Sequence, residues 1–349
     1  MQSTFARRGI AVAPHSLAAQ SALSVLREGG NALEAMIAAA ATIAVVYPHM
    51  NSIGGDGFWV INGPRGIPGG IDASGASAAA ATREWYAQRG VGSTGAPAIP
   101  FRGGLAALTV AGTVSGWGAA HALSRRALGG RLPLSRLLDD AIFLAREGTP
   151  VTQSQQALTA AKREDIGAAP GFADTFLVRG EAPVRGTLFR HPRLADTLSR
   201  IARHGSDTFY RGTLARQMAA ELAAVGSPLA LSDLERHRAR LVDPLALAAH
   251  GASLYNMVPP TQGVVSLMIL GLMERMAART DWRSPGRDPL AGPEGAAFIH
   301  AQVEATKLAF RVRDAHVTDP AFMKRDAREL LSPARLDALA SEFNPTRAA

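Results

Sequence analysis

Cysteine is absent from this chain of 349 residues. Disulfides, thiolate nucleophiles and cysteine-bound metals are therefore excluded within it. Lysine is also scarce, because Lys162, Lys307 and Lys324 are 3 of the 37 basic residues and the other 34 are arginine. The bias toward arginine is compositional, and it qualifies any argument from net charge alone.

Long apolar runs are missing too. No window reaches the roughly 18 uninterrupted apolar residues that a membrane helix requires. The first residues, MQSTFARRGIAVAPHS, lack the apolar region of a signal peptide. We therefore expect a cytoplasmic protein with no membrane partner.

The charge balance is strongly basic, with a net charge of +8 and a pI near 10.6. Such a balance suggests a polyanionic partner, but the arginines are scattered and never exceed two in a row, as in Arg7-Arg8 and Arg125-Arg126. They are not interleaved with the stacking aromatics typical of nucleic-acid grooves. We expect no nucleic-acid binding, and an acidic partner subunit is a second explanation for the charge.

Several catalytic signatures are also lacking. No G-x-S-x-G elbow and no HExxH pattern occurs, and His49, His300 and His316 each stand alone. The glycine cluster in NSIGGDGFWV leads into a strand, whereas phosphate-binding glycine motifs lead into a helix. The residues alone therefore predict no nucleophile, no metal and no cofactor.

Helix and strand signals, by contrast, are frequent, and 47% of the residues are hydrophobic. Capping residues, glycines and prolines delimit expected helices at 16–28 (capped by Ser16), 31–47 (capped by Asn31), 114–127, 134–146, 192–204, 214–224, 231–238, 262–278 and 293–315. GFWVING, GGIDASG and the two halves of LALAAHGASLYN, which meet at His250-Gly251, read as strands. Ile71–Gly75 then lies at a strand's end. The mixture predicts an α/β or α+β layered fold.

The last expected helix carries two stripes at helical spacing. Ile299, Val303, Thr306 and Phe310 form the apolar stripe. The charged stripe is read as a solvated face with ion pairs three and four residues apart, and consists of Glu304, Lys307, Arg311 and Asp314.

Three late stretches carry a specific pattern: SDTFYRGTLARQMAAEL, LVDPLALAAHGASLYNMVPPTQGVVSLMILGLME and HAQVEATKLAFRVRDAHVTDPAFM. Together they resemble the large subunit of the gamma-glutamyltransferase family. The opening helices and the glycine-rich strand start agree, and LTVAGTVSGW resembles the family's VPG segment with Ala111 in place of proline. The similarity runs in order from about Ser3 to the C-terminus.

The resemblance implies an N-terminal nucleophile hydrolase with a four-layer αββα sandwich, completed by a small subunit cut from the same precursor. It implies that residues 1–349 form a single domain, the large subunit, with no catalytic residue in this chain. The nucleophile would be the N-terminal threonine of the small subunit, which needs no cofactor. Two such subunit pairs could associate further.

The stretch DASGASAAAAT aligns without a gap to the DFREMAPAKAT-like pattern of true gamma-glutamyl transferases. Ser74 takes the place of the arginine that grips the substrate's α-carboxylate, and Gly75 takes that of the following glutamate. Serine cannot supply a charge-assisted, bidentate fork. The resemblance therefore favours family branches that act on other acyl groups, such as oxamate amidohydrolases and cephalosporin acylases.

Two further residues are candidates for substrate binding. Arg102, on a glycine-flanked loop, would bind a substrate carboxylate in place of the missing arginine. The alternative is that Arg102 is an ordinary exposed loop residue. Asp56 lines the site or stabilises a turn. Gln262 and Gly263 read as backbone requirements of packing, and the charged residues of the last helix as a structural ion-pair network.

The leading hypothesis is the large subunit of an autoprocessed amidohydrolase that hydrolyses a small amide through an acyl-enzyme. The alternatives are a gamma-glutamyl transferase or hydrolase acting on glutathione-like substrates, and an inactive homologue serving as a binding or scaffold protein.

Overall fold

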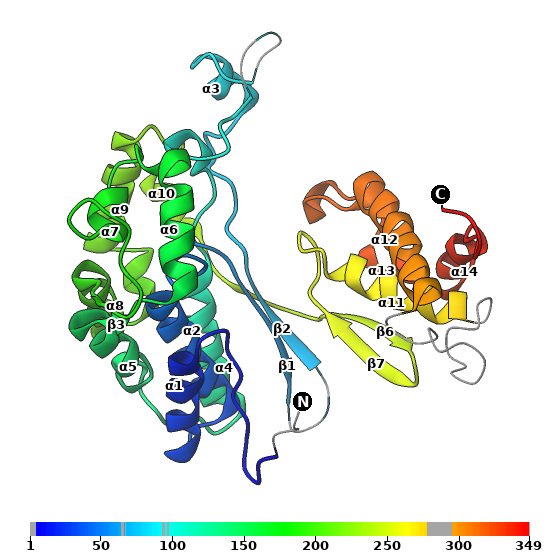
Figure 1. Cartoon of the computed structure of the whole chain (residues 1–349), viewed down its shortest axis with the longest axis horizontal. Helices are drawn as coiled ribbons and strands as arrows, with labels where there is room; N and C mark the ends of the chain where they lie inside the picture. The colour runs from blue at the N-terminus through cyan, green and yellow to red at the C-terminus, as the bar shows by residue number, and fades with distance from the viewer. Residues whose placement is uncertain are drawn as a thin grey trace. The chain divides into compact units, whose positions relative to one another are not determined.

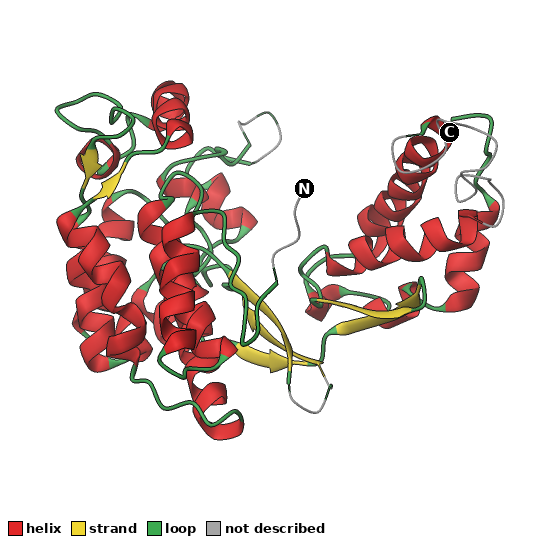
Figure 2. Cartoon of the chain, turned by 60° about the horizontal axis from the view of Figure 1, so that its bottom comes forward, coloured by secondary structure: helices red, strands yellow, loops and turns green. Residues whose placement is uncertain are grey.

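The computed structural model describes residues 5–63, 66, 68–92, 95, 98–277 and 295–348. Helices dominate these residues, and three small sheets accompany them (Figure 2). The chain divides into two compact units, Met1–Gly57 with Ala73–Arg240 and Phe58–Asp72 with Leu241–Ala349. The single domain expected over residues 1–349 stays a prediction, because neither unit's own packing tests it.

The first unit is built mainly from helices packed around α2 and α5 (Figure 1). Its core contains Trp117, Leu137 and Leu198, all fully buried. Its elements are α1 (Ser16–Arg27), α2 (Ala32–Val46), α3 (Arg83–Ala87), α4 (Thr113–Ala127), α5 (Leu134–Glu147), β3 (Thr149–Pro150), α6 (Gln153–Ile166), α7 (Phe172–Phe176), β4 (Leu188–Phe189), α8 (Pro192–His204), α9 (Thr213–Ala224) and α10 (Leu231–Arg236), with short 3-10 turns at Gly104–Ala106 and Ser206–Phe209.

Local capping explains where the first two helices begin. Asn31 caps α2 as expected, and Glu34 completes a capping box by accepting the Asn31 N–H at 3.0 Å. The same fully buried carboxylate accepts the Leu132 N–H at 2.9 Å, which ties α2 to the segment before α5. The expectation that Ser16 caps α1 is wrong. The cap is His15, one residue earlier, whose ring nitrogen accepts the Leu17 N–H.

The second unit packs helices on a hairpin. Strands β6 (Leu245–Ala249) and β7 (Ala252–Asn256) pair antiparallel about His250-Gly251, both at positive φ. Helix α11 contacts both strands and also α12 and α14. The remaining helices of the unit are α11 (Gly263–Ala277), α12 (Ala296–His316), α13 (Ala327–Leu330) and α14 (Pro333–Ser341), with a 3-10 turn at Pro320–Phe322. A three-stranded sheet has the order β1 (Gly57–Asn62), β2 (Pro68–Ala73), β5 (Arg240–Val242).

The expected helices and strands are present within the described residues, and their ends coincide with the expected ones or differ by up to three residues. The expected end at 278 and the expected start at 293 lie outside the described residues. Gly263 meets the packing requirement expected of it, since a Cβ there would lie 2.1 Å from the Met257 carbonyl oxygen. None of the described helices is long and apolar enough to cross a bilayer.

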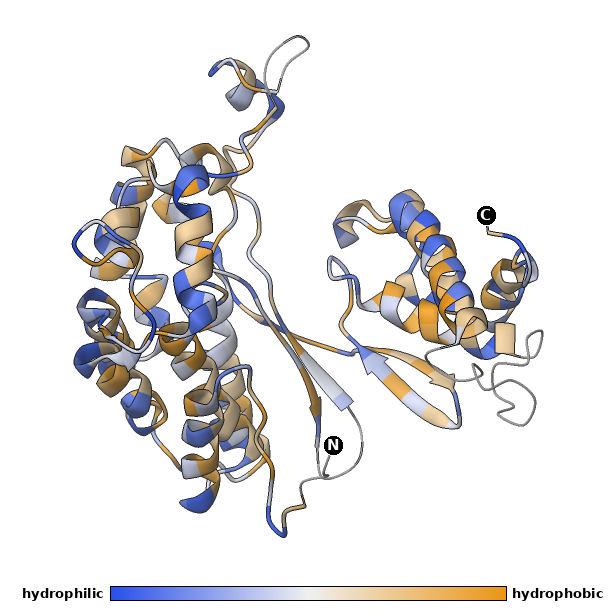
Figure 3. Cartoon of the chain, in the orientation of Figure 1, coloured by the Kyte–Doolittle hydropathy of each residue, from blue (hydrophilic) through white to orange (hydrophobic). Residues whose placement is uncertain are grey.

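Helix α12 corrects the expectation of a fully solvated charged stripe. Glu304 is buried at 4% exposure and pairs with Lys307 at 2.8 Å, whereas Ile299 and Val303 of the apolar stripe are about half exposed. Small residues around Ala305 and Ala309 face the core instead, and polar and apolar residues mix along the visible side of the helix (Figure 3). The ion-pair expectation is confirmed for Glu304 with Lys307, while Arg311 pairs with Glu342 at 2.6 Å.

Candidate functional site

Three segments of the first unit meet where β1 begins and β2 ends. They are residues 54–57 before and into β1, residues 73–77 from the last residue of β2 onward, and residues 109–113 leading into α4. We call this group the strand-end cluster. Its parts are connected by backbone hydrogen bonds, including Val110 N–H to the Ala76 carbonyl at 3.0 Å and Thr113 N–H to the Gly55 carbonyl at 2.9 Å.

Asp56 links all three segments. Its carboxylate oxygen Oδ1 accepts the Gly75 N–H at 2.9 Å across a sequence separation of 19 residues. Its backbone carbonyl accepts the Thr113 hydroxyl at 2.7 Å. The structure therefore brings together two of the candidate residues, Asp56 and Gly75, and adds Thr113, which the sequence reasoning did not single out.

The strand-end cluster is packed too closely for side chains at two glycines. A Cβ at Gly75 would lie 1.5 Å from the Val110 carbonyl oxygen, and one at Gly112 would lie 1.9 Å from the Ala73 carbonyl oxygen. Real Cβ atoms do not approach backbone so closely. Neither position accepts a larger residue unless the backbone moves, so the glutamate of the transferase pattern has no space at position 75.

A buried tyrosine bonds to the backbone of the third segment and of the first turn of α4. The hydroxyl of Tyr210 donates to the Ala111 carbonyl at 2.7 Å and accepts the Ser115 N–H at 2.9 Å. Burial raises the pKa of Tyr210, so the hydroxyl stays protonated at neutral pH. Tyr210 is part of SDTFY, a stretch that supported the resemblance without indicating this role.

The alanine run after the cluster is anchored as well. The carboxylate of Asp233, which is 6% exposed, accepts the Ala79 N–H at 3.1 Å and the Ala230 N–H at 3.0 Å, and pairs with Arg236 at 2.6 Å. Burial alone would raise the pKa of Asp233, but these hydrogen bonds outweigh it and lower the pKa. Hydrogen bonds from Gly75, Ala78 and Ala79 thus hold the stretch Ile71–Thr82 against other segments, so it is not a linker.

Of the remaining two candidates, Ser74 lies within the cluster and Arg102 lies outside it. Ser74 is half-buried and directly follows the last residue of β2 within the cluster. Arg102 lies on an exposed loop, where its guanidinium stacks 5.2 Å from the ring centroid of Phe101, and its charge adds to that of Lys162 in lowering the pKa of Asp165. That contribution places Arg102 near the end of α6. No contact joins it to the cluster among the described residues.

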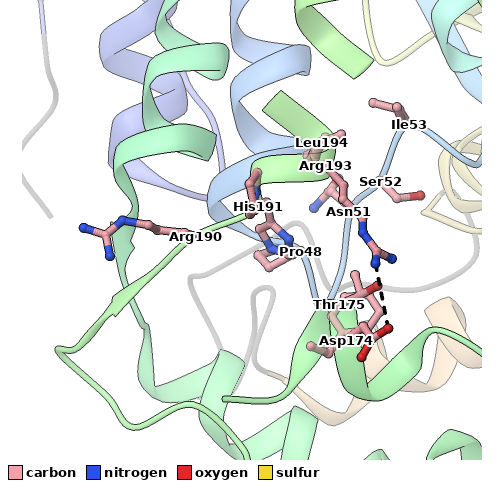
Figure 4. Close-up of a pocket in the computed structure, with 13 residues that line it drawn as sticks. Pro48, Asn51, Ser52, Ile53, Asp174, Thr175, Arg190, His191, Arg193 and Leu194 are labelled. Carbon is pink, nitrogen blue, oxygen red and sulfur yellow. Dashed lines mark ion pairs between the residues drawn. The ribbon is translucent and has the colours of Figure 1, made fainter. Parts of the chain in front are cut away.

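A cavity lies in the same unit (Figure 4). This cavity of about 510 Å³ is bounded by the loop after α2, the end of α7 and the start of α8. Its walls are mostly apolar, from side chains such as Ile53, Phe176 and Leu194, and an Arg193–Asp174 pair at 3.9 Å crosses its rim. The loop residues 51–53 that line it lead directly into the strand-end cluster.

His191 is the buried titratable group of this cavity. It is 8% exposed, its ring lies edge-on to Phe189 at 4.5 Å, and its Nε2 atom has no hydrogen-bond partner. Burial lowers its pKa to about 4, so the ring is neutral near pH 7. Nowhere in the described ranges do three histidine, aspartate or glutamate side chains gather as a metal site would require.

This geometry fits the comparisons with known proteins. The model of the gamma-glutamyltranspeptidase family matches residues 18–349. The chain is similar to the oxamate amidohydrolase proenzyme of Klebsiella pneumoniae, with 51% identity over 99% of this chain and 62% of that protein. It therefore spans about three fifths of that relative's length.

Two solved structures resemble the chain closely. The Helicobacter pylori gamma-glutamyltranspeptidase superposes with a TM-score of 0.88 at 26% identity, covering 100% of this chain and 95% of that one. The cephalosporin acylase from Bacillus halodurans gives a TM-score of 0.83 at 29% identity, covering 99% of this chain and 62% of that one.

The fold is therefore that of the N-terminal nucleophile hydrolases of this type, with mixed helices and sheets. The chain belongs to the gamma-glutamyltranspeptidase family and corresponds to its large-subunit region.

Proposed function

We propose that this chain is the large subunit of a self-cleaved amidohydrolase that hydrolyses a small amide whose acyl group is not gamma-glutamyl. One observation carries the proposal: the Ser74–Gly75 segment at the end of β2. Matched without a gap to the transferase pattern, Ser74 stands where a transferase has its carboxylate-binding arginine, and Gly75 has no room for the adjacent glutamate. The 51% identity to a protein named oxamate amidohydrolase proenzyme supports the same choice.

The reaction we propose begins on the partner subunit. The hydroxyl oxygen of its N-terminal threonine bonds to the amide carbon, while the threonine's own amino group takes the hydroxyl proton. The carbon–nitrogen bond breaks, the nitrogen leaves with that proton as ammonia, and an ester to the threonine remains. Water then attacks the ester and releases the acid. A threonine amine has an unperturbed pKa near 8, so it acts as a base without histidine.

Within this scheme the large subunit shapes the pocket and selects the acyl group. Ser74 offers one hydroxyl where the transferase pattern offers a planar cation, so a gamma-glutamyl α-carboxylate loses its bidentate partner. Such a loss costs about 2–5 kcal/mol in a buried site. Arg102 stays our candidate for holding a substrate carboxylate, and Asp56 for lining the site.

The full-length gene product tests the proposal when it is given oxamate and gamma-glutamyl-p-nitroanilide in parallel. We expect ammonia release from oxamate and a kcat/KM for the anilide lower by about 30-fold or more, which corresponds to about 2 kcal/mol. Efficient turnover of the anilide would contradict the proposal and favour a glutathione-like substrate.

The assembly and location are also proposals. We infer a heterodimer of large and small subunits, which the word proenzyme in the relative's name supports. Association of two such pairs and a cytoplasmic location are further proposals, for light scattering and cell fractionation to test. An inactive scaffold protein remains the alternative, and absence of turnover on both amides would favour it.

A further inference from the structure

We propose that Asp56 determines specificity together with Ser74: its carboxylate holds the Ser74–Gly75 segment, and its charge would neutralise an arginine placed at position 74. The inference deepens the proposed function, since it rests on position 74 lying at the pocket edge. Its consequence is that an arginine at position 74 binds a substrate carboxylate more weakly in this chain while Asp56 is present.

The carboxylate of Asp56 lies close to the backbone of position 74. Asp56 Oδ1 lies 2.9 Å from the Gly75 nitrogen. That nitrogen is bonded to the carbonyl carbon of Ser74, which places the Ser74 Cα about 2.4 Å from it. The carboxylate therefore lies beside the backbone of position 74, within reach of any long side chain that starts there.

Hydrogen bonds and close packing hold the backbone around Asp56 and Gly75. Thr113 donates its hydroxyl to the Asp56 carbonyl at 2.7 Å and its N–H to the Gly55 carbonyl at 2.9 Å. Gly75 meets the Val110 carbonyl so closely that it cannot retreat in that direction. The backbones of both positions are therefore held in place, and the hydrogen bond from Gly75 keeps the exposed carboxylate beside position 74.

The negative charge of Asp56 would attract an arginine at position 74. A guanidinium beside a carboxylate forms a charge-assisted and often bidentate pair. An arginine at position 74 would bind Asp56 and leave a substrate carboxylate to compete for the same donors. An uncharged serine does not attract the carboxylate in this way. The serine at 74, the glycine at 75 and the aspartate at 56 are therefore one coupled set.

A double-mutant cycle on the full-length gene product tests the coupling. The variants are Asp56→Asn, Ser74→Arg and their combination, and the readout is kcat/KM for gamma-glutamyl-p-nitroanilide. Asparagine keeps the acceptor oxygen for Gly75 and removes the charge. We expect the double variant to exceed Ser74→Arg by about tenfold, mainly through a lower KM.

The matched control moves the arginine two residues along. Ala76 is exposed and belongs to the same segment, so Ala76→Arg with Asp56→Asn adds the same charges away from position 74. We expect this control to show no gain in kcat/KM for gamma-glutamyl-p-nitroanilide. Equal values for Ser74→Arg and the double variant, or an equal gain in the control, would overturn the inference.

A second readout requires no substrate. Hydrogen exchange followed by mass spectrometry of overlapping peptides reports the Gly75 amide, and we expect it to exchange about tenfold faster in Asp56→Ala but close to the wild-type rate in Asp56→Asn. Wild-type exchange in Asp56→Ala would overturn the holding role. Failure of the wild type to hydrolyse oxamate would count against the proposed function alone, because neither comparison above depends on oxamate.

Discussion

At position 75 there are two separate reasons for a glycine, close backbone packing and, in the proposed function, selection of the acyl group. The amide nitrogen of Gly75 donates to Asp56, and the missing side chain lets the Val110 carbonyl approach. A residue chosen for either reason looks the same in the sequence. The structure separates the two reasons, because it shows that packing alone requires glycine here.

Gly75→Ala tests this requirement. The added methyl group meets a backbone oxygen, which cannot rotate away as a side chain would, so we expect a loss of about 1–3 kcal/mol in the free energy of unfolding, toward the upper end. Gly55→Ala is the matched control in the same cluster, since its Cβ would meet nothing within 4 Å and its φ is not in the left-handed region. Urea unfolding of both variants measures the difference, and equal losses would contradict the packing argument.

Sequence reasoning placed Ser74 and Gly75 at a strand's end, and β2 does end at Ala73. The contact between Asp56 and Gly75 was not predictable, because no periodicity links residues 19 positions apart on either side of a strand connection. Thr113 and Tyr210 escaped notice for a similar reason. Each acts on backbone groups of a distant segment, and such partners leave no pattern in the chain.

At the scale of elements, the sequence predicts where most helices begin and end but not which of their faces is buried. Caps, glycines and prolines predicted most boundaries, because they act through neighbouring backbone groups. In α12 the apolar stripe through Ile299 and Val303 is half exposed, while alanines and Glu304 face inward. Small residues allow close helix packing without a strong hydrophobic stripe, so periodicity alone did not indicate which face of α12 is buried.

The start of α8 should make stability depend on pH. Burial lowers the pKa of His191 from 6.5 to about 4, so between these values the unfolded chain binds a proton that the folded protein does not. Stability therefore falls as the pH falls through this range, by roughly 2 kcal/mol between pH 7 and pH 5.

His191→Phe removes the titrating group and keeps an aromatic ring beside Phe189. Urea unfolding at the two pH values should then show a difference smaller than that of the wild type by roughly 2 kcal/mol. His204→Phe, at the exposed far end of the same helix, is the control and should keep the wild-type difference. An unchanged difference in His191→Phe would contradict the assignment.

At the scale of the whole molecule, the chain covers 62% of the length of its amidohydrolase relative and shows no nucleophile of its own in sequence. Its described residues provide a close-packed strand end and a cavity. The account therefore places the bond-breaking group on a second polypeptide that arises by cleavage of one precursor. This claim supports every other part of the proposed function.

The mass spectrum of the purified full-length gene product, with N-terminal sequencing, tests that claim most directly. The account predicts two polypeptides, the smaller of which begins with threonine, and a single uncut chain when that threonine is replaced by alanine. A wild-type product that stays in one piece, or a smaller polypeptide that begins with a residue lacking a hydroxyl or thiol group, would contradict it.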